Sequence, residues 1–125
     1  MTQEQINKLV SDRMACQCKA CQHQVKPYRF GASNNLVNGW AIFDQTHNTN
    51  TYVKSQKVAS DIVSAFKDAV AALWPDYVLQ GGIYYHKADP VLMTDEQFEQ
   101  LKKDRGLENK TFNFIRFSIL NSLNN

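Results

Sequence analysis

The chain has 125 residues, of which 43% are hydrophobic and 21% are charged, and its formal net charge is +2. This length predicts a single domain over residues 1–125, and so small a charge gives no reason by itself to expect binding to nucleic acid or to membranes. No run approaches the roughly 20 apolar residues of a membrane span, and the three cysteines lie too close together to staple a secreted fold. We therefore expect a cytoplasmic protein without a membrane partner.

The first predicted element is a long helix. Thr2 and Gln5 fit a capping box, and the apolar residues that follow recur at intervals of three and four. Neither glycine nor proline interrupts this pattern before Pro27. The sequence therefore predicts one helix from residue 3 to about residue 26.

Inside this predicted helix lie four possible metal ligands, Cys16, Cys18, Cys21 and His23. Thiolates and imidazole are the ligands that zinc selects. Structural zinc sites, however, usually take their ligands in two pairs from separate turns, and elsewhere only His47 and His86 offer an imidazole. On a continuous helix, Cys18 and Cys21 lie on the apolar face, where free cysteine is readily buried. We therefore expect no metal or other cofactor, and we name the four clustered residues as the ligands should zinc bind.

The middle of the chain begins with short strands. Strands are expected at residues 36–37, 40–43 and 52–54, with Asn38-Gly39 as a two-residue hairpin turn. Residues 44–51 are rich in threonine and asparagine, which predicts an exposed loop that carries a solvated His47.

The clearest signal is an amphipathic helix over residues 56–74. Its apolar residues recur at helical spacing, and its charged residues fall on the opposite face. Ser55 can cap its start, and Pro75 ends it. Two more strands are predicted after it, at residues 77–80 and 83–87 around Gly81-Gly82.

The last third of the chain predicts helices. Thr94 and Gln97 fit a second capping box, and Gly106 ends the helix that follows. Residues 111–120 suit a helix or a strand, and we favour the helix. The elements together predict an α+β fold, in which a small antiparallel sheet of residues 40–43, 77–80 and 83–86 is packed by the long N-terminal helix and the central amphipathic helix, with a helical C-terminal segment.

No motif of an enzyme is present. Paired carboxylates, a phosphate-binding loop, a nucleophile elbow and a His-Glu metal pattern are all missing, so we expect no enzymatic activity. Aromatic rings instead lie beside cations in extended or loop segments, and rings stack on bases while cations hold phosphates. This chemistry suits a nucleotide-like small molecule; the alternative, core aromatics and solvated cations, fits any single residue at least as well. The candidate ligand-binding residues are Arg29, Trp40, Tyr84, Tyr85, His86 and Lys87.

Four segments carry a resemblance to a known family: Leu36-Val37-Asn38-Gly39-Trp40, Ala65 to Val70, Leu73-Trp74-Pro75, and Tyr77-Val78-Leu79-Gln80. Over about residues 35–80 the chain resembles the Thoeris anti-defence sponges, a family of short phage proteins. The resemblance implies a non-enzymatic homo-oligomer, acting in the cytoplasm of an infected bacterial host, that binds and sequesters a cyclic nucleotide-derived immune signal.

Two other classes of function stay open. The first is a small phage-type inhibitor that blocks a host defence nuclease complex by protein-protein contact, as anti-CRISPR proteins do. The second is a zinc-stabilised accessory protein. A sponge gains thermal stability from its nucleotide, an inhibitor co-purifies with a host defence protein, and a zinc protein loses its fold in chelator.

Overall fold

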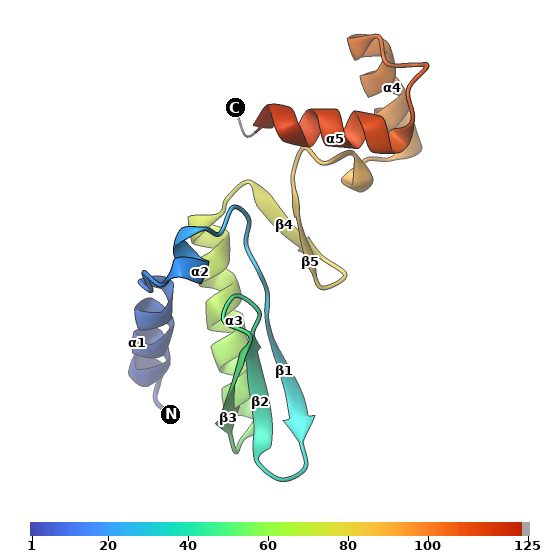
Figure 1. Ribbon diagram of the computed structural model, residues 1–125. Coiled ribbons are helices and arrows are strands. Elements are labelled where there is room, and N and C mark those ends of the chain that lie inside the picture. Colours follow the sequence, from blue (N-terminus) through green and yellow to red (C-terminus); the bar gives the residue numbers. More distant parts are fainter. Residues whose placement is uncertain (124–125) are drawn as a thin grey trace. The chain divides into compact units, whose positions relative to one another are not determined.

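The computed structural model describes residues 1–123 and divides into two compact units, with the boundary between Tyr84 and Tyr85 (Figure 1). The elements in chain order are α1 (Gln3–Met14), α2 (Lys19–Gln22), β1 (Phe30–Asn35), β2 (Gly39–Asp44), β3 (Thr49–Val53), α3 (Gln56–Leu73), β4 (Tyr77–Gln80), β5 (Ile83–His86), the 3-10 helix η1 (Pro90–Leu92), α4 (Asp95–Arg105) and α5 (Phe112–Leu123). They confirm the predicted α+β fold. A single domain over residues 1–125 stays a prediction. Within residues 1–123, no helix combines the length and the apolar character needed to cross a membrane.

Strands β1, β2 and β3 form one antiparallel sheet in that order, in which Phe30 lies opposite Asp44 and Trp40 opposite Val53. Strands β4 and β5 form a separate two-stranded sheet. The predicted single sheet of residues 40–43, 77–80 and 83–86 is therefore wrong. The physical reason is that β2 finds both of its neighbours through short hairpin connections, which favour strands adjacent in sequence.

The turn between β1 and β2 differs from the prediction. Leu36 and Val37 were expected in a strand, but they lie in the turn and are 97% and 90% exposed. The Asn35 Oδ1 atom accepts hydrogen bonds from the backbone N–H groups of Val37 and Asn38, at 3.1 and 2.8 Å, which is an Asx turn. Asn35 then pairs with Gly39, so the predicted two-residue turn is wrong as well.

Helix α3 crosses one face of the three-stranded sheet and also packs against α1 (Figure 1). Its predicted ends are confirmed, because the Ser55 hydroxyl accepts a hydrogen bond from the Val58 N–H and Trp74 caps the C-terminus just before Pro75. Phe66 stacks on Phe30 with ring centroids 4.0 Å apart. The core of this unit consists of Ile6, Val10, Phe30, Ile42, Ala59, Ile62, Val63, Phe66 and Val70.

The N-terminal helix is much shorter than predicted. Its capping box at Thr2 and Gln5 is confirmed, but α1 ends at Met14 and α2 is only four residues long, so a single helix to about residue 26 is wrong. The sequence lacks a helix breaker here, and cysteine and glutamine tolerate a helix. Contacts with the distant Asp44 and His47 override this weak local preference.

The second unit confirms the predicted helices. Helix α4 begins at the Thr94–Gln97 capping box and ends at Gly106, which adopts a left-handed φ of 66°. Helix α5 covers most of residues 111–120, as favoured over a strand. Asp89 is a buried residue, only 2% exposed, and its side chain accepts hydrogen bonds from Arg116 Nε at 2.8 Å and Nη2 at 3.0 Å, which joins η1 to α5.

Candidate metal centre

Four possible metal ligands, Cys16, Cys18, Cys21 and His47, meet in the first unit. Cys16 follows the end of α1, Cys18 caps the N-terminus of α2, and Cys21 lies within α2. His47 comes from the turn between β2 and β3. The hairpin and the short helical turn thus bring together residues that lie about 30 positions apart in the sequence.

The distances suit a tetrahedral metal ion. The Nε2 atom of His47 lies 3.6, 3.3 and 3.2 Å from the sulfur atoms of Cys16, Cys18 and Cys21. All four ligand atoms lie within 4.8 Å of one another. Zinc bonds of about 2.3 Å to sulfur and about 2.0 Å to nitrogen place tetrahedral ligand atoms about 3.5–3.8 Å apart, close to this spacing.

A carboxylate orients the imidazole. The Oδ2 atom of Asp44 lies 3.0 Å from His47 Nδ1, and its Oδ1 accepts a hydrogen bond from the His47 backbone N–H at 3.3 Å. With a proton on Nδ1, the lone pair of Nε2 faces the sulfur atoms. This is the carboxylate–histidine–metal arrangement common to zinc sites.

Asp44 in turn is held by Arg13, whose Nε and Nη2 atoms donate to its two oxygens at 2.5 and 3.1 Å. Burial raises the pKa of Asp44, but the hydrogen bond and the charge of Arg13 outweigh burial, so the pKa lies below its usual value. Asp44 therefore stays ionised, and its Oδ2 atom can accept a hydrogen bond from a proton on His47 Nδ1.

The thiols differ in their acidity. The backbone N–H of Cys21, followed by hydrogen bonding among the clustered side chains, lowers the pKa of Cys18 to about 6. Burial and the neighbouring sulfur atoms raise the pKa of Cys21 to about 11. Such divergent values arise where thiols crowd together, and a divalent cation at their centre favours the thiolate form of each.

His23, the fourth ligand named from the sequence, is exposed and lies outside this group, although the three cysteines belong to it. His47 takes the fourth place, so the prediction of a solvated His47 is wrong. Its side chain is only 25% exposed. No local signal identifies His47 as a ligand. Its partners come from a segment that the sequence pattern wrongly assigns to one continuous helix.

The predicted ligand-binding residues fall in different places. Arg29 and Trp40 line one cavity of about 450 Å³ in the first unit, together with polar residues of α3. Tyr84 is half-buried against the core of the first unit, and burial raises its pKa.

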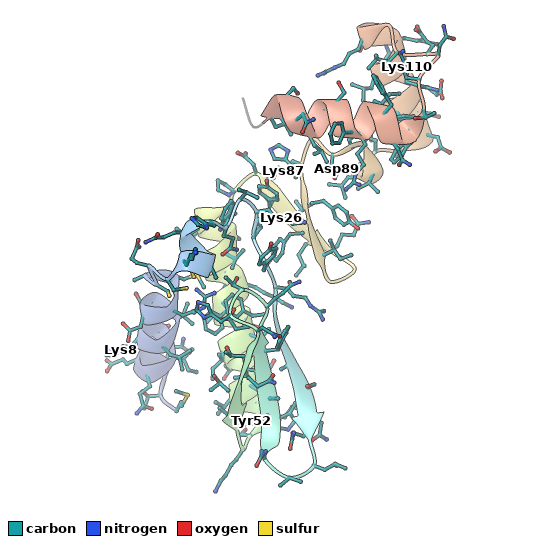
Figure 2. All side chains as sticks on the ribbon, in the orientation of Figure 1. Lys8, Lys26, Tyr52, Lys87, Asp89 and Lys110 are labelled. Atoms are coloured by element: carbon teal, nitrogen blue, oxygen red, sulfur yellow. The ribbon has the colours of Figure 1, made fainter. Side chains whose placement is uncertain are left out.

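The other three predicted residues belong to the second unit. Tyr85 and His86 are half-buried there, and the His86 Nδ1 atom accepts a hydrogen bond from the Ala88 N–H at 3.0 Å. Lys87, labelled in Figure 2, is exposed. Binding roles for Tyr84, Tyr85, His86 and Lys87 stay predictions.

Comparison with known proteins adds no further guide to the site, since no protein-family model, no curated protein and no solved structure matches this chain.

Proposed function

We propose that the chain is a non-enzymatic, zinc-binding protein whose first unit is stabilised by one Zn²⁺ held by Cys16, Cys18, Cys21 and His47. The observation that supports this proposal most strongly is the convergence of three sulfur atoms on one imidazole nitrogen, at 3.2–3.6 Å. This replaces the expectation that the cysteines act as small core residues. Three soft thiolates and an imidazole select zinc over magnesium or calcium.

The ligand set supports a structural role for the metal rather than a catalytic one. Catalytic zinc usually has three protein ligands and an open position for water, whereas four protein ligands complete a tetrahedron. A structural role also fits the small size of the unit. Its 84 residues bury a modest core, and a metal that joins the α1–α2 segment to the β2–β3 turn adds stability that so small a core lacks.

The test compares two histidine variants of the full chain. His47→Ala removes a proposed ligand, and His23→Ala removes the exposed imidazole next to the same cysteines. We expect wild type and His23→Ala to bind one equivalent of Co²⁺ with the intense thiolate-to-cobalt and tetrahedral d–d bands. His47→Ala should show altered d–d bands and a zinc affinity at least 10-fold weaker. Equal affinity and spectra for the two variants would contradict the proposed ligand set.

A second candidate function, binding of a nucleotide-like anion, is favoured by the cavity between β1, β2 and α3. Two cations, Arg29 and Lys67, line this cavity, and within residues 1–123 neither side chain has a hydrogen-bond or ion-pair partner. The ring of Trp40 lies in the same lining, which contains no carboxylate. A ligand that carries a flat ring and an anionic group suits these residues. A sponge that sequesters a cyclic nucleotide-derived signal would use such a site; the alternative of a defence inhibitor needs no small molecule.

This candidate is tested by thermal shift of the zinc-loaded protein with a panel of cyclic nucleotides. A ligand present at 100 times its dissociation constant should stabilise the fold by about 2.7 kcal/mol. The response should disappear in Arg29→Ala and Lys67→Ala but persist in Lys57→Ala, an exposed α3 lysine paired with Asp61. Unchanged melting across the panel would leave the inhibitor as the better interpretation.

A further inference from the structure

Arg13 contacts the cluster in two ways. Besides its paired hydrogen bonds to Asp44, its Nη1 atom lies 3.5 Å from the Cys21 sulfur. One planar guanidinium thus reaches one proposed ligand directly and a second, His47, through Asp44. The side chain is 15% exposed and lies over the Phe30 ring at 5.3 Å, so its position is fixed by packing as well as by hydrogen bonds.

The charges make this contact important. A zinc ion with three thiolates and a neutral imidazole has one net negative charge, and Asp44 adds another close by. Arg13 supplies the opposing positive charge at a shielded position, where charges interact more strongly than in bulk water. Its rigid fork can serve a carboxylate and a sulfur together, which a lysine ammonium cannot do in the same geometry.

Arg13 also connects the centre to the packing of a helix. It lies in the last turn of α1, whose Ile6 and Val10 are buried in the core against α3. The position of its guanidinium therefore depends on the docking of α1. If docked α1 places Arg13 on the metal ligands, metal binding must stabilise the docked helix by the same free energy, since such coupling is reciprocal.

We propose that Arg13 is a positioning residue of the metal centre, which holds Asp44 and the Cys21 thiolate in place and thereby couples metal binding to the docking of α1. This inference rests on the proposed zinc site.

The experiment uses three variants of the full chain: Arg13→Gln, Arg13→Lys and the control Lys8→Gln. Lys8 is on the same helix, but its side chain is 77% exposed and extends away from the rest of the unit (Figure 2). Zinc affinity is measured by competition with a chromophoric chelator. The thiolate-to-cobalt band reports changes at the metal centre. Amide hydrogen exchange in α1, measured with and without zinc, reports the docking of the helix.

We expect Arg13→Gln to lower zinc affinity by about 10- to 100-fold, the usual effect of losing an outer partner of a metal ligand, and to shift the thiolate-to-cobalt band. Arg13→Lys should fall between Arg13→Gln and wild type, while Lys8→Gln matches wild type. Zinc should slow amide exchange in α1 of the wild type far more than in Arg13→Gln. If Arg13→Gln does not fold, the band shift and affinity of Arg13→Lys decide the question.

The experiment distinguishes failure of the proposed metal site from failure of the proposed coupling. Wild-type protein that binds no stoichiometric zinc would overturn the metal site itself. Wild-type protein that binds zinc, with affinity, cobalt spectrum and α1 exchange unchanged in both Arg13 variants, would overturn the coupling alone.

Discussion

The different environments of the cysteines predict different reactivities in the metal-free protein. Cys18 is exposed, and the Cys21 N–H holds its pKa at about 6, whereas burial raises the pKa of Cys21 to about 11. At pH 7.5 nearly all of Cys18 is therefore thiolate, while Cys21 is nearly all thiol. The thiolate is the form that attacks a disulfide reagent.

The expected ratio of rates follows from two opposing effects. A pKa of about 6 against about 11 gives Cys18 an about 3,000-fold larger thiolate fraction at pH 7.5. A thiolate of lower pKa is also less nucleophilic, and a Brønsted coefficient of about 0.45 over this interval costs about 180-fold. The remaining advantage of Cys18 is about 20-fold, and the lower exposure of Cys21 adds to it.

The assay treats chelator-stripped protein with a small disulfide reagent at pH 7.5 and follows each cysteine by peptide mass spectrometry. Cys18 should react first, by at least an order of magnitude over Cys21. Prior addition of zinc should protect both, and His47→Ala should weaken that protection. Equal rates for Cys18 and Cys21 would refute the proposed arrangement of hydrogen bonds in the cluster.

Four further predictions concern the core and one turn of the first unit and an ion pair of the second unit. Phe66→Ala, which removes a ring that is 4% exposed, should lower the free energy of unfolding by about 3–5 kcal/mol in chemical denaturation; a cost under 1 kcal/mol would contradict the stacked core. Gly39→Ala should cost more than about 1 kcal/mol, because φ is 96° and an added Cβ lies 2.5 Å from the Val53 carbonyl oxygen, while Gly31→Ala, with open space, serves as the control. Asp89→Asn should destabilise the second unit by about 1.5–3 kcal/mol in hydrogen exchange, and exposed Glu99→Gln should not. Burial raises the pKa of Asp89, but the hydrogen bond from Arg116 outweighs burial, so the folded-state pKa lies below its usual value. The stabilising contribution of the Asp89 carboxylate is therefore present above pH 3.8 and is lost as the pH falls through the lower folded-state pKa. Stability that does not depend on pH in this range would contradict the ion pair.

Local chemistry explains which elements were predictable. Ser55 and Pro75 bracket α3, and the two Thr-Gln capping boxes mark α1 and α4, because each of these signals acts within a few residues. No such signal marks Met14, where α1 ends without a local breaker. The end of β1 was not predictable either, because the Asx turn at Asn35 places Leu36 and Val37 outside the strands.

The candidate site was half predictable for the same reason. Cys16, Cys18 and Cys21 are conspicuous because they are neighbours in sequence. His47 and Asp44 join them only after the β2–β3 hairpin forms, and Arg13 only after α1 docks. Nothing in the spacing of residues 13–23 specifies these partners, so His23 was the natural choice of fourth member, whereas the structure brings His47 to the three cysteines.

The most direct test of the proposed metal centre is X-ray absorption at the zinc edge of the purified, zinc-loaded full chain. We predict one zinc per chain, with three sulfur neighbours at about 2.3 Å and one nitrogen neighbour at about 2.0 Å. Substoichiometric metal, or a first shell dominated by oxygen, would contradict it.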